Sequence, residues 1–260
     1  MTTLTFAVQD SATMTRRSFR HVLRYPGTLI TSVGVPVLLL LLFVGVFGAL
    51  KAGLGAASDF SYIDYVLPGI IVMTAAYGSS GTALAVNRDS TEGIIGRFRT
   101  MAISPASVLN GHVVGALVRT LVSVALVIGV AIGLGFRPTA DAGRWLAAAG
   151  LTALLVLALT WLAVPFGLAA KTAEGLSGFI LIVQLLPFIS SAFVPPDQMS
   201  GAVRWFAAHQ PFTPVIDTLR GLLTGTPDGR TALAAVAWCA GLALAGYLWA
   251  RALLRRDLNR

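Results

Sequence analysis

The stretch that decides the fold is Val66–Pro105, VLPGIIVMTAAYGSSGTALAVNRDSTEGIIGRFRTMAISP, in which an apolar run passes directly into a charged segment. Residues 66–86 have the length of a membrane-spanning helix, since about 20 apolar residues cross a hydrocarbon core of roughly 30 Å. Residues 87–105 are too short and too charged to cross, so we expect them to form a helix that lies along the membrane face.

The charged segment is two-faced at helical spacing. Its apolar face consists of Ile94, Ile95, Phe98, Met101 and Ala102, and its polar face of Arg88, Asp89, Glu92, Arg97 and Arg99. Asp89 is predicted to be the N-cap, with Glu92 three residues later as in a capping box. Pro105 disfavours a helical conformation at the residue before it and so marks the end. A membrane protein with such a helix is expected to use it to contact a partner.

The composition of the whole chain indicates a membrane protein. Hydrophobic residues make up 56% of the 260 residues and charged residues 12%, whereas soluble domains carry about a quarter charged residues. The apolar runs are 28–50, 66–86, 113–135, 145–170, 176–194 and 231–254. Continuous runs exclude the alternating pattern of a barrel. The sequence predicts one all-α transmembrane domain over residues 1–260, with six transmembrane helices.

The basic residues favour one orientation in the membrane. With the N-terminus inside, 12 Lys and Arg residues fall in cytoplasmic segments and 6 in outer segments. The positive-inside rule then places both termini in the cytoplasm. The formal net charge of +8 becomes a feature of the cytoplasmic face, where it suits contact with membrane lipids rather than with nucleic acid.

Two other segments lie outside the runs. Residues 10–25 carry four arginines opposite apolar residues, which is typical of an interfacial helix. This helix is either an anchor for the first span or an elbow that also touches a cytosolic partner. Residues 195–229 are too long for a plain connection. Their apolar stretches, Val203–Phe206 and Val215–Leu223, predict two short re-entrant helices before the sixth span.

Motifs of catalysis are missing from the sequence. It contains no phosphate-binding loop G-x-x-x-x-G-K-[ST], no H-E-x-x-H and no G-x-S-x-G. His21, His112 and His209 are scattered along the chain and offer no metal constellation, and no run has an acidic residue in its interior. We therefore expect neither catalysis nor a metal or cofactor on this chain.

The polar residues inside the runs allow two interpretations. Thr74 and Tyr77 in the second run, and Gln184 in the fifth, either join helices by hydrogen bonds or line a mildly polar path for an amphipathic substrate. Arg119 is the one ionisable residue well inside a run. Such charges usually serve function, but its side chain is also near enough to the inner end to snorkel. Both interpretations of Arg119 stay open.

The order of these features resembles that of a known family. The shared residues are Arg88-Asp89, Glu92-Gly93, Arg97-Phe98-Arg99 and Ile103-Ser104-Pro105 in the charged segment, and Phe193-Val194-Pro195-Pro196, His209–Pro214, Asp217 and Arg220-Gly221-Leu222 before the sixth run. Together they resemble the permease subunit of ABC-2 type exporters, especially the actinobacterial branch named for daunorubicin resistance. The commonest family form has an Asn where this chain has Gln210.

The resemblance implies an exporter subunit in a bacterial cell membrane. It would form a homodimer, bind two copies of a separate ATPase that holds ATP and Mg, and move an amphipathic drug-like or lipid-like molecule outward. The coupling residues would be Asp89, Glu92, Ile95, Arg97, Phe98, Arg99 and Met101. The dimer contact would run through spans one and five. The substrate path would include Thr74, Tyr77, Gln184 and Phe188.

Other functions remain open from the sequence. Export of a glycolipid or polysaccharide would use the same fold, although polysaccharide permeases tend to have more aromatic linings. A membrane-embedded transferase would need an acidic or histidine pair that the sequence does not show. A scaffold would leave the charged helix without a purpose.

Overall fold

The computed structural model describes residues 26–53, 62–92 and 105–258. These residues form helices and no strands. The helices are α2 (Pro26–Gly53), α3 (Tyr62–Thr91), α5 (Pro105–Gly133), α6 (Ala142–Ala169), α7 (Ser177–Leu185), α8 (Gly201–His209), α9 (Phe212–Thr224) and α10 (Gly229–Leu258), with short 3-10 helices η1 (Glu174–Leu176), η2 (Leu186–Ile189) and η3 (Pro196–Gln198). The all-helical prediction is confirmed for this part of the chain.

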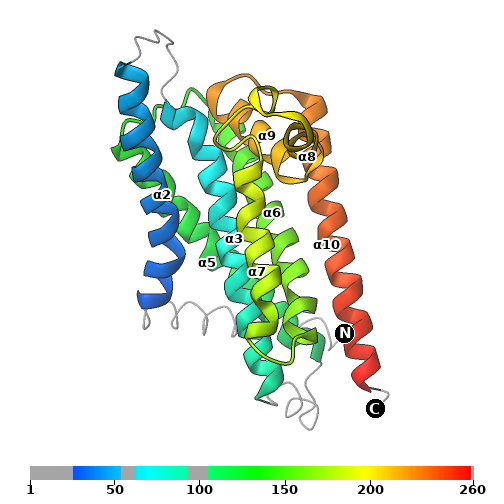
Figure 1. Ribbon diagram of the computed structural model, residues 1–260. Coiled ribbons are helices and arrows are strands. Elements are labelled where there is room, and N and C mark those ends of the chain that lie inside the picture. The colour runs from blue at the N-terminus through cyan, green and yellow to red at the C-terminus, as the bar shows by residue number, and fades with distance from the viewer. Residues whose placement is uncertain (1–25, 54–61, 93–104, 259–260) are drawn as a thin grey trace.

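The long helices form one bundle (Figure 1). Helices α8 and α9 cover one end of it, which we call the α9 end. The last turn of α3, the first turn of α2 and the last turn of α10 lie at the opposite end, which we call the Asn87 end after Asn87 in that turn of α3. Successive long helices run back and forth between the two ends, as a multi-pass membrane protein requires.

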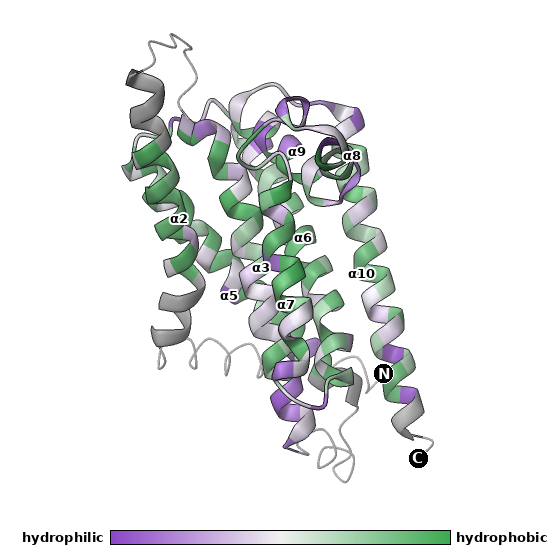
Figure 2. Ribbon diagram, in the orientation of Figure 1, coloured by the Kyte–Doolittle hydropathy of each residue, from purple (hydrophilic) through white to green (hydrophobic). Residues whose placement is uncertain are grey.

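Apolar residues fill the middle of the bundle and polar residues gather at its ends (Figure 2). Four helices of the described residues are long and apolar enough to cross a membrane: Tyr62–Thr91, Leu109–Gly133, Ala142–Ala169 and Gly229–Arg255. Val33–Val46 and Glu174–Ile189 are shorter apolar helices. The chain is therefore a multi-pass membrane protein, and the count of six spans stays a prediction.

The fifth predicted span, residues 176–194, is interrupted. Helix α7 ends at Leu185, η2 continues only to Ile189, and Ser190 is extended with φ −121 and ψ −171. Pro187 lies inside η2 and has no N–H to donate, so the α-helical ladder cannot pass through it. The correction is that the helical part of this apolar run stops short of its predicted end.

Helix α3 is the centre of the bundle. Within its most apolar window 78% of residues are buried, against 17% for α10. Small residues allow its neighbours to approach closely. A Cβ on Gly69 would stand 2.5 Å from the Cβ of Ala192, and one on Gly167 of α6 would stand 2.7 Å from the carbonyl oxygen of Ala83. These contacts fix α3 against α6 and against the segment after η2.

The polar end of α3 differs from the prediction. The helix continues to Thr91, so Asp89 lies inside its last turns and is not the N-cap of a new helix. The backbone N–H groups near Asp89 already serve α3, because Glu92 N donates to Arg88 O at 2.9 Å. Residues 93–104, with Ile95, Arg97, Phe98, Arg99 and Met101, lie outside the described residues, as does the predicted interfacial helix 10–25.

Two short helices precede α10, as the sequence predicts. Helix α9 buries Val215, Ile216 and Leu219 against the bundle and ends at Gly225, whose φ of 91 favours glycine. Helix α8 is mostly exposed, with Trp205 at 66%. Their placement in the outer leaflet stays a prediction.

Candidate transport site

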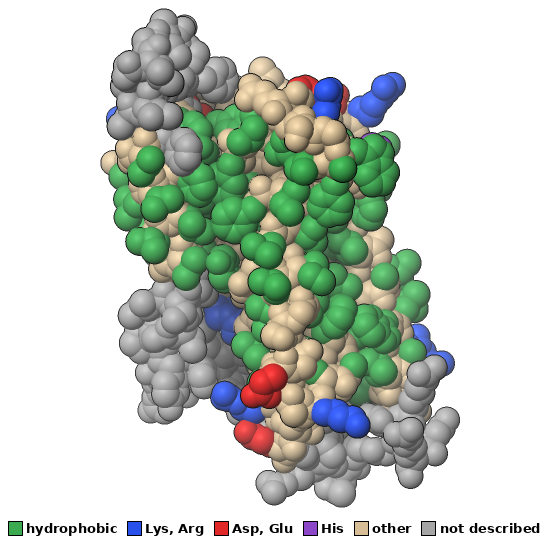
Figure 3. Space-filling view, viewed as in Figure 1, with side chains coloured by type: hydrophobic (Ala, Val, Ile, Leu, Met, Phe, Trp, Pro, Cys, Tyr) green, Lys and Arg blue, Asp and Glu red, His purple; other side chains and the backbone are tan. Residues whose placement is uncertain are grey.

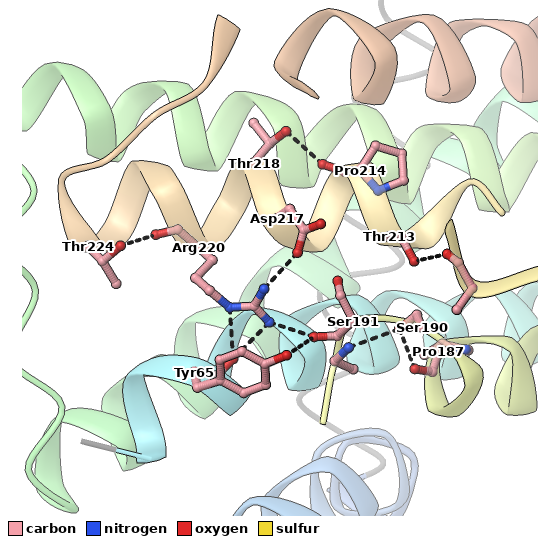
Figure 4. A network of polar contacts seen from close by, with 12 residues as sticks. Tyr65, Pro187, Ser190, Ser191, Thr213, Pro214, Asp217, Thr218, Arg220 and Thr224 are labelled. Atoms are coloured by element: carbon pink, nitrogen blue, oxygen red, sulfur yellow. Dashed lines mark hydrogen bonds and ion pairs between the residues drawn. The ribbon is translucent and has the colours of Figure 1, made fainter. Parts of the chain in front are cut away.

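Arg220 of α9 joins three segments at the α9 end (Figure 4). Its Nη1 donates to Asp217 Oδ1 at 2.6 Å. Its Nη2 donates to the carbonyl oxygens of Ser191 at 2.7 Å and Tyr65 at 3.2 Å. Tyr65 belongs to α3 and Ser191 to the segment after η2, so one guanidinium connects α3, the interrupted run and α9.

The aromatic ring of Tyr65 completes this cluster. The Arg220 Cζ lies 3.9 Å from the ring centroid, a cation–π distance. The Tyr65 hydroxyl donates to Ser191 O at 3.1 Å. Ser191 lies beyond the end of η2, so no helical ladder uses its carbonyl oxygen, and two side chains bind it instead. We call Tyr65, Ser191, Asp217 and Arg220 the Arg220 cluster.

Gln210, in the connection between α8 and α9, binds the carbonyl oxygens of η2, where the fifth predicted span is interrupted. Its side chain is buried, and its Nε2 donates to Ile189 O at 2.6 Å and to Leu186 O at 3.3 Å. Both are carbonyls of η2, where the helical ladder ends. The residue that departs from the commonest family form therefore satisfies main-chain acceptors that the break leaves open.

The four predicted path residues do not share one environment. Thr74 is 1% exposed, and its hydroxyl donates to Ile70 O within α3. Tyr77 is half-buried. Gln184 of α7 donates to Ser80 Oγ at 3.4 Å, a long contact between α7 and α3. Phe188 is exposed and stacks on Phe193 with ring centroids 5.4 Å apart. A path role for these residues stays a prediction, and Thr74 has no open side in this conformation.

One face of α3 is open toward the Asn87 end. Tyr77, Gly81, Leu84 and Arg88 follow at i, i+4, i+7 and i+11, which is one stripe of a helix. Tyr77 is half-buried and the other three are exposed, whereas the residues between them are mostly buried. We call these four residues the α3 strip. A substrate that reaches the inside of the bundle along α3 would meet this strip.

Two polar contacts hold the last turns of α3. Asn87 is 3% exposed, and its Nδ2 donates to Ala170 O at 2.6 Å and Gly167 O at 3.2 Å at the end of α6. Asp89 Oδ2 lies 2.9 Å from Nε2 of His112 on α5. Glu92 is exposed just beyond the helix. The start of the predicted coupling segment is therefore attached to both α5 and α6.

Sequence reasoning did not find the roles of Asn87 and Arg220. Asn87 begins the charged segment and Arg220 lies in a motif before the sixth run, but their partners are main-chain carbonyls far away in sequence. These belong to Gly167, Ala170, Tyr65 and Ser191. For Arg220, the signal available in the sequence was Pro187. A proline that interrupts a buried helix leaves main-chain carbonyl oxygens without their helical donors, and side chains elsewhere must then donate to them.

Residues 10–224 match the ABC-2 type transporter family. This is more than half of the chain, so the chain belongs to the ABC-2 type transporter family, and the prediction of the family from the sequence is confirmed.

The similar proteins are named as permeases. The chain is 31% identical over 229 residues to the daunorubicin resistance ABC transporter permease protein DrrB1 of Streptomyces coeruleorubidus, covering 85% of this chain and 77% of that protein. It is 25% identical over 215 residues to the probable doxorubicin resistance ABC transporter permease protein DrrC of Mycobacterium tuberculosis, covering 83% and 77%. It is 26% identical over 221 residues to the putative transport permease ycf38 of Cyanophora paradoxa, covering 84% and 75%.

Proposed function

We propose that this chain is the membrane-spanning subunit of an ATP-driven exporter that moves an amphipathic, drug-like or lipid-like molecule out of the cytoplasm or the inner leaflet. The observation that carries the proposal is the family match over residues 10–224, on a multi-pass helical bundle. The names of its relatives, which refer to daunorubicin and doxorubicin resistance, favour a drug-like cargo. Glycolipid or polysaccharide export is the second candidate on the same fold.

ATP hydrolysis is assigned to a separate ATPase, two copies of which bind a permease dimer together with ATP and Mg. The exposed apolar side chains of α7 and α2 support a homodimer through these helices. They are Leu181, Ile182 and Leu185 on α7, Phe188 and Ile189 on η2, which follows it, and Leu38, Leu41, Leu42 and Val46 on α2. The mass of the purified particle in detergent tests this stoichiometry.

The Asn87 end is proposed to face the cytoplasm. The positive-inside rule motivates this orientation, because the outer segments hold half as many Lys and Arg residues as the inner ones. Cysteines placed at Ser58 and Gly201 should react with a membrane-impermeant thiol reagent from outside. Cysteines at Thr100 and Asn259 should not react, and the opposite labelling pattern would reverse the orientation.

Coupling to the ATPase is proposed to run through residues 89–101, with Asp89, Glu92, Ile95, Arg97, Phe98, Arg99 and Met101 as contacts. The attachment of α3 at this end supports the idea. Asn87 binds α6 and Asp89 binds His112 of α5, so a displacement of the segment would reach three helices together. Mechanical coupling needs an element that both states of the ATPase contact differently.

Reversing the charge of Glu92 tests this coupling. Glu92 is exposed, so in a merely solvated segment Glu92→Arg should leave transport unchanged. In a segment that docks against the ATPase, the reversal places a like or unpaired charge in a partly desolvated contact, which costs about 2–5 kcal/mol. We expect Glu92→Arg to remain inserted and dimeric, and to lose ATPase co-purification or substrate-stimulated hydrolysis.

The matched control is Glu174→Arg. Glu174 is also exposed and begins η1, in the connection between α6 and α7, and this connection lies at the Asn87 end (Figure 1). At matched expression, the control variant should retain co-purification of the ATPase and transport. Wild-type co-purification and transport in Glu92→Arg would remove the coupling role of this segment.

A further inference from the structure

Arg119 places a positive charge in the middle of a membrane-spanning helix. It is the central residue of α5, which runs from Pro105 to Gly133. It is not in contact with any carboxylate within ion-pair distance among the described residues. A guanidinium has five N–H donors, and none of them makes a hydrogen bond within that part of the chain.

The level of the guanidinium in the bundle follows from the register of α3 and α5. The Thr120 side chain lies against Gly78, and His112 lies against Asp89. Because the two helices run in opposite directions, the Cα of Arg119 falls beside residues 79–82 of α3. Its Nη2 lies 3.8 Å from the position of a Cβ on Gly81, and therefore at the same level.

The Arg119 side chain does not reach the last turn of α3. Gly81 and Asp89 are eight residues apart on α3, or about 12 Å at 1.5 Å per residue. A side chain that reached for the interface would lie nearer Asp89 than Gly81. The guanidinium lies beside Gly81, which is 19 residues after the start of α3 at Tyr62 and 10 before its end at Thr91. It therefore lies within the apolar part of the helix, on the side of the Asn87 end, where an unpaired charge is costly and marks a functional site by default.

Four of the described carboxylates pair with other cations. Asp89, Asp141, Asp197 and Asp217 pair with His112, Arg144, Arg204 and Arg220. The hydroxyl of the next residue, Thr120, lies against Gly78, is buried and has no hydrogen-bond partner among the described residues. Among the described residues the guanidinium therefore has donors and no anionic partner, which is the chemistry that receives an anion.

The charge is reachable from one side, along the α3 strip. Gly81 is exposed and has no side chain, and Arg119, whose Nη2 lies beside it, is partly exposed. Leu84 is 42% exposed beside it. Arg88 is exposed at the Asn87 end of the strip, seven residues or about 10 Å from Gly81. Figure 3 shows Lys and Arg side chains below the hydrophobic band of the face that it presents.

We propose that Arg119 and the α3 strip bind the anionic headgroup of an amphiphile, a phosphate or a carboxylate, with its hydrocarbon chain against Leu84 and Tyr77. Arg88 attracts the headgroup at the Asn87 end and Arg119 holds it beside Gly81, within the apolar part of α3, through charge-assisted hydrogen bonds. The inference rests on the proposed export function, for which it names the substrate class. The same chemistry is available from a transported amphiphile and from a membrane phospholipid.

Binding by the full-length chain in phosphatidylcholine nanodiscs tests the site, without ATPase or ATP. The probes are dodecyl phosphate, dodecanol, dodecyltrimethylammonium and inorganic phosphate. We expect dodecyl phosphate to bind about tenfold or more tightly than dodecanol, as charge-assisted hydrogen bonds predict. The cationic probe should bind no better than dodecanol, and inorganic phosphate should not compete.

Four variants test which residues cause the preference for dodecyl phosphate over dodecanol. Arg119→Gln should abolish the preference for dodecyl phosphate, and Arg119→Lys should keep part of it. Gly81→Leu keeps the charge and fills the space beside the guanidinium, so it should also abolish the preference. Arg204→Gln removes a cation at the α9 end and should change nothing. An undiminished preference in folded Arg119→Gln and Gly81→Leu overturns the proposal, as does equal competition by inorganic phosphate.

Two further measurements distinguish a membrane phospholipid from a transported amphiphile as the molecule whose headgroup binds. Competition by phosphatidylglycerol in the nanodisc, lost in Arg119→Gln, identifies a lipid headgroup as an occupant. ATP-dependent uptake of dodecyl phosphate into vesicles that contain the permease and its ATPase, also lost in this variant, identifies a cargo. Either result supports the site. Since the binding assay needs no ATPase, its failure leaves the export function and the Glu92 experiment standing.

Discussion

The two ends of the bundle are held together differently. At the α9 end, the Arg220 cluster joins α3, α9 and the interrupted run, and Gly69 lets Ala192 pack directly on α3. At the Asn87 end, α3 is attached to α5 and α6 by Asn87 and Asp89, while its strip stays open. One end is closed by buried polar contacts, and the other exposes a surface.

This difference indicates which half of the molecule can change shape. Closely packed backbone and buried hydrogen bonds resist small displacements, so the α9 end is expected to move as one body. The open half can accept a ligand or a second copy of the chain without first breaking such contacts. In an exporter with the Asn87 end inside, entry from the cytoplasmic side would need less rearrangement than release on the other side.

The largest expected effect is that of Arg220→Gln. The variant removes the Arg220 donors from the carbonyl oxygens of Tyr65 and Ser191, of which Ser191 O keeps only the Tyr65 hydroxyl, and it leaves Asp217 without its cation. We expect a loss of about 2–4 kcal/mol in the free energy of unfolding, measured by denaturant titration in detergent. The magnitude reflects burial, since the Arg220 side chain is 18% exposed.

The control for this prediction is Arg204→Gln at the same end. Arg204 pairs with Asp197 at 2.8 Å, but the two side chains are 56% and 85% exposed. Exposed pairs contribute about 0–1 kcal/mol, so the free energy of unfolding should barely change. Equal losses in the two variants would show that the Arg220 cluster does not hold the α9 end together.

A matched pair of glycines on α3 compares the two halves directly. In Gly69→Ala the new Cβ would stand 2.5 Å from the Cβ and 2.9 Å from the Cα of Ala192, so the backbone must shift. We expect a loss of about 1–3 kcal/mol from overpacking. In Gly81→Ala the nearest atom is Arg119 Nη2 at 3.8 Å, an ordinary contact.

For Gly81→Ala, the difference in helix propensity between glycine and alanine decides whether the variant gains or loses stability. Alanine is favoured over glycine in a helix interior by roughly 0.5–1 kcal/mol, so this variant should be as stable as the wild type or slightly more stable. The measurement is the midpoint of thermal unfolding in one detergent for both variants. Destabilisation by Gly81→Ala would mean that the α3 strip is covered, and would weaken the contrast between the two ends.

The sequence predicted the positions of the long helices because hydropathy alone marks them. The predicted runs 66–86 and 231–254 correspond to Tyr62–Thr91 and Gly229–Leu258. The observed helices are longer at both ends, since backbone hydrogen bonds continue into polar residues beyond the apolar run. Asp89 was misassigned for this reason, because a capping residue and a polar helical residue look alike in one sequence.

The contacts at the site could not be predicted in the same way. Arg220 binds main-chain carbonyls, which have no sequence signature, and one of them is 155 residues away along the chain. The level of the Arg119 side chain depends on the register between α3 and α5, which the contact of Thr120 with Gly78 sets. Hydropathy gives the length of each helix but not its rotation or its register against a neighbour.

The smallest expected effect is that of an exposed polar contact at the α9 end. It tests whether burial, or position at this end, decides how much a polar contact contributes to stability. Asp228 precedes α10 and accepts hydrogen bonds from the hydroxyl and the N–H of Thr231 and from the N–H of Arg230. These bonds favour the carboxylate, led by the Thr231 hydroxyl, and lower the pKa of Asp228 below its ordinary value of 3.8. The folded pKa lies below the unfolded one, so the stabilisation is present above about pH 3.8 and is lost as the pH falls through the folded pKa.

Hydrogen exchange at the Arg230 and Thr231 amides measures this effect. Protection of the two amides should fall with pH in that window in the wild type, and Asp228→Asn should remove the pH dependence. Global stability should stay close to that of the wild type, because the carboxylate is exposed and its bonds end on the first turn of one helix. A global loss as large as that of Arg220→Gln would mean that position at the α9 end, rather than burial, decides how much a polar contact contributes there.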